Sequence, residues 1–227
     1  REYLQTLSLG GRIFNQANLG CGVAWNQGAL ALQADWTIVM NNDVLVSAQW
    51  IEKLLHTAET LGLKVISPAL IEGALDYDFE QFSMDASSRM SQVHRIGARH
   101  AVCLAIHKSV WLDVGYFQPV PKLLGYEDTL FFHELNKAKI PMGMTGAAWL
   151  HHYGSITQTA MKQERGLSQK QGLGYRYNHR LLNQSWLERK LAKLERNRQN
   201  KTWCTTEIAQ YGQSIHGLRK NSEFEWI

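Results

Sequence analysis

The stretch WTIVMNND, residues 36–43, joins a short apolar segment to three polar residues. Its first five residues are mostly apolar, aromatic or β-branched, which is typical of a buried strand. The segment ends abruptly at Asn41-Asn42-Asp43. Ligands of open α/β sheets bind at the carboxyl ends of the strands, and an aspartate there can bind a hard divalent cation. The same residues can instead form a turn that caps the next helix, so the stretch alone supports both interpretations.

The segments on either side of this strand alternate between helical and strand patterns. The expected order is helix, strand, helix and strand, over residues 18–34, 36–40, 51–61 and 64–68. Asn18 and Ser47 are candidate N-caps of the two helices, and the apolar residues of the second helix recur on one face. Helices that alternate with strands are typical of an α/β sheet, which is the fold class we predict.

The later patterns are shorter. Residues 70–95 are polar and are predicted to form a long loop, of the kind that is usually functional or mobile. Strands are expected at 99–107, 140–144 and 147–150, and helices at 111–117 and 127–137. After residue 157 the strand signals become sparse, and residues 185–199 predict a basic helix. We therefore expect a domain over residues 1–157 and a basic helical extension over residues 158–227.

The composition limits the class of protein. With 227 residues, of which 44% are hydrophobic and 19% charged, the chain can bury a core and does not resemble a disordered chain. Its three cysteines, Cys21, Cys103 and Cys204, lie far apart. This argues for a reducing compartment and against a disulfide framework or a zinc finger. No apolar run approaches the roughly 18 residues of a membrane span, and we expect a cytoplasmic protein.

Positive charge is concentrated between residues 161 and 201, where eleven Lys or Arg residues accompany three Glu. Such a run is most often a solvated helix face, and the few aromatic residues among it argue against specific nucleic-acid binding. Residues 185–199 combine Trp186 and three leucines with basic residues at helical spacing. A basic amphipathic helix can lie on an anionic membrane surface. A peripheral membrane contact there is one hypothesis, and the other is that the leucines cover the core of the domain.

Three polar clusters follow apolar segments of the chain: Asn41-Asn42-Asp43, Gly125-Tyr126-Glu127-Asp128 and His151-His152. Because strand ends and helix starts of an α/β fold converge on one edge, these side chains are expected to meet. A metal bound there would neutralise charge that develops on phosphate oxygens. A separate carboxylate could take the proton of an attacking hydroxyl. The set therefore suits a transfer reaction with a phosphorylated leaving group.

The order and spacing of these clusters resemble the family 2 glycosyltransferases of GT-A fold. Each motif is weak alone, but together they run in family order across residues 15–157. The matching segments are Asn15-Gln16-Ala17-Asn18-Leu19-Gly20, Asn26-Gln27-Gly28, Met40-Asn41-Asn42-Asp43, Val114-Gly115-Tyr116-Phe117, Gly125-Tyr126-Glu127-Asp128 and His151-His152-Tyr153-Gly154-Ser155. The resemblance implies an α/β fold in which helices flank a Rossmann-like GT-A sheet of the nucleotide-diphospho-sugar transferases.

The resemblance also implies the residues of a donor site. The segment Asn41-Asn42-Asp43 matches the Asp-X-Asp position of the family, with Asp43 as a metal ligand and Asn41 near the ribose or diphosphate. Asn18 and Asn26 fall in a segment that lines the donor side. Each residue has a structural alternative, because Asp43 can cap a helix and the two earlier asparagines can be caps or packing residues.

Further roles follow from the resemblance for the acids and histidines. Asp128, with Glu127 beside it, matches the acidic pair from which the catalytic base is drawn. His151 matches a histidine that completes the shell of Mn²⁺ or Mg²⁺ in some members, and His152 is the fallback. The alternatives are that the acids stabilise the start of a helix and that the histidines are hydrogen-bonded core residues.

The implied reaction is inverting transfer of a hexosyl or deoxyhexosyl unit from a nucleotide-diphosphate donor to a glycan or lipid-linked acceptor, in polysaccharide or glycan biosynthesis. The acceptor oxygen would attack the anomeric carbon while Asp128 removes its proton. The alternative is a non-catalytic GT-A-like module that binds a nucleotide sugar or scaffolds a larger synthase. A nucleotidyltransferase has less support, because no glycine-rich phosphate loop is followed by Arg or Lys.

The sequence departs from the family pattern at two places. The family's first strand, and the following segment with an Asp that reads the nucleotide base, have no counterpart. A strand–helix–strand unit of at least about 30 residues would precede Arg1, so we expect a fragment or a mis-started reading of a longer protein. Alone, it should fold poorly or have a sheet with an exposed edge. After Asp128, the positions of a second Asp and an Arg in many members hold Leu130 and Glu134. No second Asp competes with Asp128, and one group that could stabilise negative charge is lost.

Overall fold

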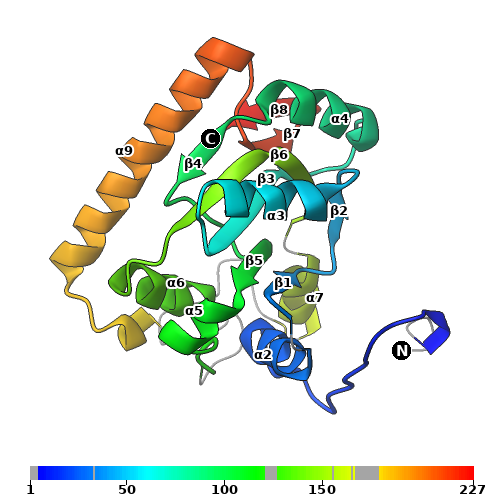
Figure 1. Cartoon of the computed structure of the whole chain (residues 1–227), viewed down its shortest axis with the longest axis vertical. Helices are drawn as coiled ribbons and strands as arrows, with labels where there is room; N and C mark the ends of the chain where they lie inside the picture. The colour runs from blue at the N-terminus through cyan, green and yellow to red at the C-terminus, as the bar shows by residue number, and fades with distance from the viewer. Residues whose placement is uncertain (1–4, 33, 121–126, 155, 165, 167–178) are drawn as a thin grey trace.

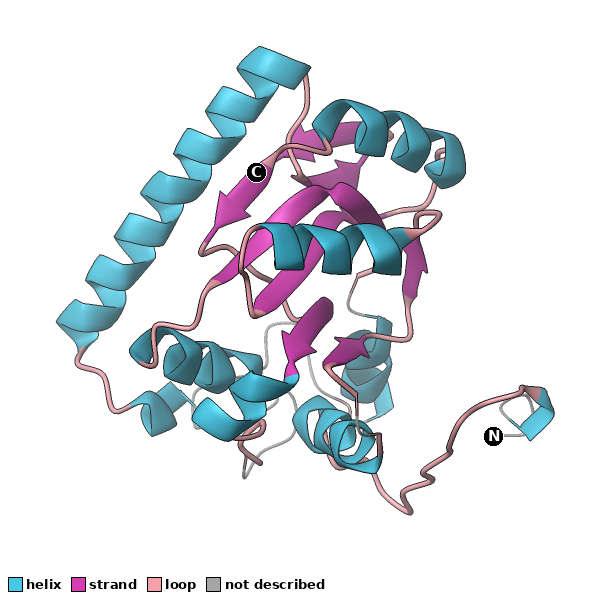
Figure 2. Cartoon of the chain, viewed as in Figure 1, coloured by secondary structure: helices cyan, strands magenta, loops and turns pink. Residues whose placement is uncertain are grey.

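The computed structural model describes residues 5–32, 34–120, 127–154, 156–164, 166 and 179–227 (Figure 1). Its strands are β1 (Trp36–Met40), β2 (Val44–Val46), β3 (Val65–Gly73), β4 (His94–Ile96), β5 (Cys103–His107), β6 (Met142–His152), β7 (His216–Lys220) and β8 (Glu223–Trp226). Its helices are α2 (Cys21–Ala31), α3 (Trp50–Thr60), α4 (Phe79–Met90), α5 (Lys108–Asp113), α6 (Glu127–Lys137), α7 (Ile156–Glu164) and α9 (Trp186–Tyr211), with a 3-10 turn η1 (His179–Leu182). Helices surround one sheet, as Figure 2 shows, and the predicted α/β class is confirmed.

The sheet is mixed and has eight strands in its described part. Its main path runs β1-β5-β3-β6-β2, while β4 pairs with β6 and β7 pairs with both β3 and β8. Strand β3 is parallel to β6 and β7, and the other pairs are antiparallel. All eleven residues of β6 are buried, which is typical of a central strand that is covered on both faces.

Helices cover both faces of the sheet. Val65 packs with Phe131 and other apolar residues of α5 and α6, whereas its neighbour Ile66 packs with Leu54 and Ala58 of α3. Because successive residues of a strand point to opposite faces, α3 and α6 lie on opposite sides of β3. The helix predicted at residues 51–61 is confirmed as α3, whose buried residues are Leu54, Thr57 and Ala58.

Residues 70–95 are not a loop, and that prediction is wrong. Strand β3 continues to Gly73, and α4 and β4 follow within the same segment. Asp78 caps α4 by accepting a hydrogen bond of 3.0 Å from the backbone N–H of Gln81. The helix was missed because its few apolar residues, such as Phe79, Ala86 and Met90, are separated by polar ones. The short β4 lies against β6.

The two strands predicted at 140–144 and 147–150 form one strand, β6. Its register with β3 shifts between Pro68, which is opposite Thr145, and Ala69, which is opposite Trp149. The chain approaches α4 closely at this irregularity, because a Cβ atom on Gly146 would lie 2.5 Å from the Met90 carbonyl oxygen. Gly146 therefore interrupts the strand pattern in the sequence, although strand β6 continues through it.

Ser47 does not cap α3, contrary to the prediction. Its backbone N–H donates to the Trp149 carbonyl at 3.0 Å, and its hydroxyl accepts from the Trp149 N–H at 3.1 Å. The N-cap position belongs to Gln49, which has a left-handed backbone with φ of 54°. The hydroxyl is used to extend the contact between the β2 region and β6.

The segment after residue 157 contains strands as well as helices. After α9 the chain returns to the sheet, where β7 pairs with β3. Arg95 of β4 and Glu207 of α9 form a buried ion pair of 2.8 Å, which joins the long helix to the sheet. The predicted basic helix is present and extends to Tyr211, while the division at residue 157 stays a prediction.

Strand β1 forms one end of the main path. It pairs with β5, and the strands described by the structure include no second partner for it. Strand β1 is therefore an edge strand in the described part of the sheet, and the expected absence of a preceding unit stays a prediction. Among the described residues, none of the helices combines the length and the apolar character needed to cross a bilayer.

Candidate functional site

Asp43 lies in the turn between β1 and β2, and the backbone of this turn is held from both sides. The Asn41 N–H donates to the Val102 carbonyl at 2.8 Å, and the Tyr153 N–H donates to the Asp43 carbonyl at 3.2 Å. The Asp43 side chain is 17% exposed, and its Oδ1 lies 3.3 Å from Nε2 of His152. The turn after the first strand of the sheet therefore presents a partly accessible carboxylate next to a histidine.

His152, the last residue of β6, lies between two carboxylates. Its Nε2 faces Asp43, and its Nδ1 lies 3.2 Å from Oε1 of Glu72. The hydrogen bond with Glu72 raises the pKa of His152 above its ordinary value, and the charges of both acids act in the same direction. In turn, the hydrogen bond with His152 and the proximity of His216 hold the pKa of Glu72 far below its usual range.

His151 points to the other face of the sheet. A hydrogen bond of 2.9 Å joins its Nδ1 to the Tyr77 hydroxyl, and its ring packs against Phe79 and Tyr153. Desolvation lowers its pKa. Because adjacent strand residues alternate in direction, the structure brings His152 to Asp43 and keeps His151 away from it. The geometry favours the fallback assignment, and the metal role of either histidine stays a prediction.

The two acids at the start of α6 have different surroundings. Glu127 is buried, and a Cβ atom on Gly22 of α2 would lie 3.2 Å from its Cβ. Asp128 is only partly buried, and its Oδ1 accepts a hydrogen bond of 2.7 Å from the Thr129 N–H. Glu127 thus packs between two helices, while Asp128 is the more accessible carboxylate.

Cys21 connects the acids to the turn of Asp43. The pKa of its thiol is raised by desolvation and then by the negative charges of Glu127, Asp128 and Asp43. The carboxylates of the β1–β2 turn and of α6 are therefore close enough to the first residue of α2 for their charges to act on its thiol. No motif in the sequence pointed to Cys21, because only the fold places it among them.

The predicted donor-side asparagines divide into two groups. Asn41 Nδ2 lies 3.5 Å from Nε2 of His152, and Asn42 is exposed in the same turn. Asn26 instead binds the backbone of Phe117 twice, at 2.7 and 3.0 Å, and Asn18 accepts from the Gly20 N–H at 2.9 Å. The last two side chains make structural contacts next to α2, and their role on the donor side stays a prediction.

The sequence was then compared with known families. Residues 1–101 match the model of glycosyl transferase family 2. This part of the chain therefore resembles the family 2 glycosyltransferases. The matched region contains Asp43 and Glu72, whereas the acids of α6 and His152 lie beyond it. A comparison with curated proteins gave no match.

Asp43 and His152 supply one oxygen and one nitrogen that could bind a metal. No group of three His, Cys, Asp or Glu side chains in the described ranges is arranged to hold a metal. Mg²⁺ is usually bound by one or two carboxylates together with substrate phosphates. The donor set therefore fits a cation that a nucleotide diphosphate shares, and it does not fit a closed protein site.

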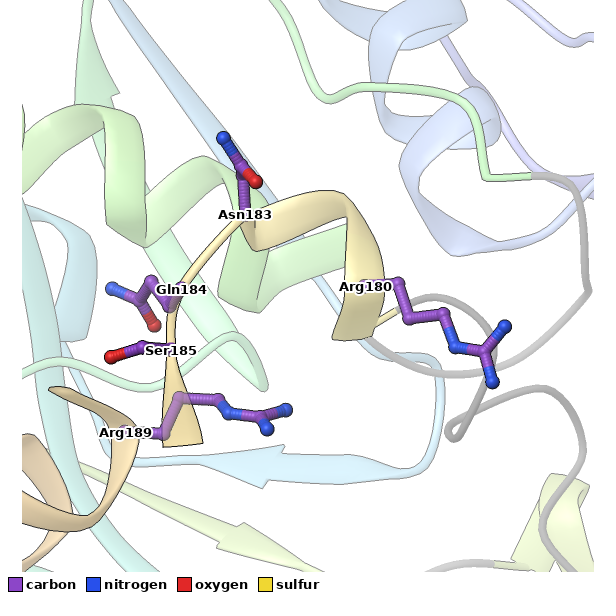
Figure 3. Close-up of a pocket in the computed structure, with 5 residues that line it drawn as sticks. All are labelled: Arg180, Asn183, Gln184, Ser185 and Arg189. Carbon is purple, nitrogen blue, oxygen red and sulfur yellow. The ribbon is translucent and has the colours of Figure 1, made fainter. Parts of the chain in front are cut away.

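Two cavities lie apart from these side chains. One of about 570 Å³ runs beside β1 and includes Thr37, Trp111 and Leu112 in its lining. The other, of about 470 Å³, lies at the start of α9, where Arg180 and Arg189 extend to one side of the chain (Figure 3). Its other lining residues are Asn183, Gln184 and Ser185. The Ser185 hydroxyl already caps α9, and we assign no ligand to either cavity.

Proposed function

We propose that this protein transfers a sugar from a nucleotide-diphosphate donor to an acceptor hydroxyl, with inversion at the anomeric carbon. The observation that carries the proposal is that Asp43 and Nε2 of His152 lie 3.3 Å apart, while Glu127 packs on Gly22 of α2, next to Cys21, on which the charges of Asp43, Glu127 and Asp128 all act. A ligand for the donor's metal and a candidate base then belong to one site, although they are far apart in the sequence. This arrangement favours an enzyme over a non-catalytic nucleotide-sugar module.

At the donor end, Asp43 and His152 would hold Mn²⁺ or Mg²⁺ together with the diphosphate. When bound, the cation neutralises the negative charge that develops on the departing diphosphate. Asn41 and Asn42 would contact the ribose or the diphosphate through their amides. The turn is suited to this task because hydrogen bonds hold its backbone at both ends, so the side chains are positioned before the donor binds.

At the acceptor end, Asp128 would accept the proton of the attacking hydroxyl. The acceptor oxygen forms a bond to the anomeric carbon as the bond between that carbon and the diphosphate oxygen breaks. Hydrogen bonds from Thr129 orient the Asp128 carboxylate. The buried Glu127 is the less accessible of the two acids, which supports Asp128 as the base. A single displacement of this kind inverts the anomeric carbon.

We also propose that the acceptor is a glycan or a lipid-linked molecule. In addition, we propose that α9 contacts the cytoplasmic side of a membrane peripherally. Leu187, Leu191 and Leu194 are 61%, 64% and 56% exposed, so they do not cover the core. At about 100° per residue, they lie opposite the buried Glu207. Basic residues flank this apolar stripe, among them Lys190, Arg198 and Lys201. A basic helix with an outward apolar stripe suits an anionic lipid surface.

The test of the proposed function is calorimetry with UDP, GDP and dTDP, each with and without Mn²⁺. We expect one nucleotide to bind in a metal-dependent manner, and Asp43→Ala to abolish that dependence. Asp85→Ala is a matched control, because Asp85 is an exposed carboxylate on α4. Absence of binding to every nucleotide would contradict a working donor site and favour the scaffold alternative.

A further inference from the structure

We propose that Glu72 is a positioning residue, which holds the imidazole of His152 so that its Nε2 faces Asp43. The inference rests on the proposed function, since it concerns the same donor site. Glu72 lies in the segment that the sequence predicted as a loop. The structure places it near the end of β3, directly opposite His152 in the register of β3 and β6.

The contacts of His152 support one arrangement of its ring hydrogens. Nδ1 is 3.2 Å from a Glu72 oxygen, which can only accept when the acid is ionised. The Asn41 Nδ2 group, a donor, lies 3.5 Å from Nε2. Nε2 also lies 3.3 Å from Oδ1 of Asp43, which is an acceptor, but of the two carboxylate contacts only that of Nδ1 with Glu72 has hydrogen-bond geometry, so a neutral ring carries its hydrogen on Nδ1. The Nε2 lone pair then points to the space beside Asp43.

This is the arrangement in which a histidine can bind a metal. Histidines that ligate metals usually donate their second ring N–H to a carboxylate or carbonyl, which fixes the tautomer and the direction of the ring. Asp43 Oδ1 and His152 Nε2 are already 3.3 Å apart. Glu72 therefore has the position of the outer carboxylate, without itself lying next to Asp43.

Glu72 is itself held by the sheet. Strand β3 is parallel to β6 on one side and to β7 on the other, and the register pairs Glu72 with His152 and with Leu218. Its second oxygen lies 3.8 Å from Nε2 of His216, which is too far for a strong hydrogen bond. A carboxylate on a paired strand can fix a ring more accurately than one on a loop.

The first experiment measures Mn²⁺-dependent binding of the nucleotide that binds the wild-type protein. Glu72→Ala is expected to weaken Mn²⁺ binding by about 10–100-fold, while Glu72→Gln, which keeps an acceptor oxygen, is expected to lose less. His216→Ala is the matched control, because it removes the other neighbour of Glu72 and leaves His152 in place. Thermal unfolding of each variant checks that it is folded.

A double-mutant cycle separates positioning from a structural effect. If Glu72 acts through His152, then Glu72→Ala should change Mn²⁺ affinity little in a protein that already carries His152→Ala. Equal losses in the two backgrounds would overturn the inference. So would a loss in His216→Ala as large as that in Glu72→Ala.

A second measurement does not depend on metal or nucleotide. Long-range ¹H–¹⁵N spectra of the imidazoles report which ring nitrogen carries the hydrogen, and His152→Ala identifies the signals of His152. At a pH that leaves the ring neutral, we expect the Nδ1–H tautomer in the wild type and its loss in Glu72→Ala. An Nε2–H tautomer in the wild type would overturn the inference. Failure of nucleotide binding together with the expected tautomer would reject the proposed function alone.

Discussion

The charged cluster around Arg95 and the one around His152 both lie on the described sheet, and they are built in different ways. In the first, Arg95 binds both oxygens of Glu207 at 2.8 and 3.0 Å and also contacts Ser214 and the Ile227 carbonyl. In the second, His152 lies between Asp43 and Glu72, and both acids remain partly exposed. A buried charge whose hydrogen-bonding groups all have partners within the protein favours a structural role. A partly exposed carboxylate can still bind a ligand.

The comparison predicts that variants of the second cluster and its neighbouring acids change activity, and that variants of the first change stability.

The largest effect is expected for Asp128→Asn, which should lower turnover by about 10²–10⁴-fold because the base is lost. Donor binding should stay unchanged. Release of nucleoside diphosphate from the bound sugar donor measures turnover, and Glu134→Gln on the same helix is the control. Unchanged turnover in Asp128→Asn would exclude it as the base.

For the first cluster, Glu207→Gln should lower the free energy of unfolding by about 3–5 kcal/mol, since it leaves the buried Arg95 without a counter-ion. Urea denaturation measures the change. The control is Glu225→Gln, whose partner Lys220 is 60% exposed, and for which a loss of about 0–1 kcal/mol is expected. Similar losses in the two variants would show that the buried cluster is not the stabilising one.

A third prediction concerns pH and the surroundings of Glu72. Desolvation lowers the pKa of His100 from 6.5 to about 4. The unfolded chain therefore binds the proton first, and the neutral ring contributes stability above pH 6.5 that is lost as the pH falls toward 4. The loss should reach about 3 kcal/mol.

Urea denaturation between these pH values measures the slope, and His100→Asn should reduce it. The pKa of His152 is raised, so the contribution of its ring to stability changes with pH in the opposite direction. Its contribution is complete below its ordinary pKa of 6.5 and is lost as the pH rises through the folded-state value. A slope that is the same in His100→Asn and in the wild type would contradict the assignment to His100.

The smallest effect is expected on the outer face of α9. Leu191→Asp should weaken sedimentation with anionic vesicles by roughly tenfold, because it removes apolar contact and adds negative charge. Leu112→Asp, at a site that is 86% exposed on α5, is the control. Binding that does not depend on anionic lipid would remove the membrane proposal and leave the two charged clusters unaffected.

Much of the fold could be predicted from local patterns. The apolar run of β1 and the helical face of α3 depend on neighbouring residues alone, and both elements were found close to their bounds. Helix α4 was missed because its buried residues are few and widely spaced. Strand β6 was divided because its irregularity around Gly146 depends on a contact with α4.

In the candidate site, too, some features could be predicted from the sequence and others depend on the tertiary structure. The sequence determined the chemical groups: Asp43 after a strand, the acids that begin α6, and two adjacent histidines. Only the tertiary structure decided that His152 and not His151 meets Asp43, and that Glu72 stands behind it. The physical reason is that alternation along β6 and its register with β2 and β3 set these contacts. Register is a property of paired strands, and no single segment of the sequence contains it.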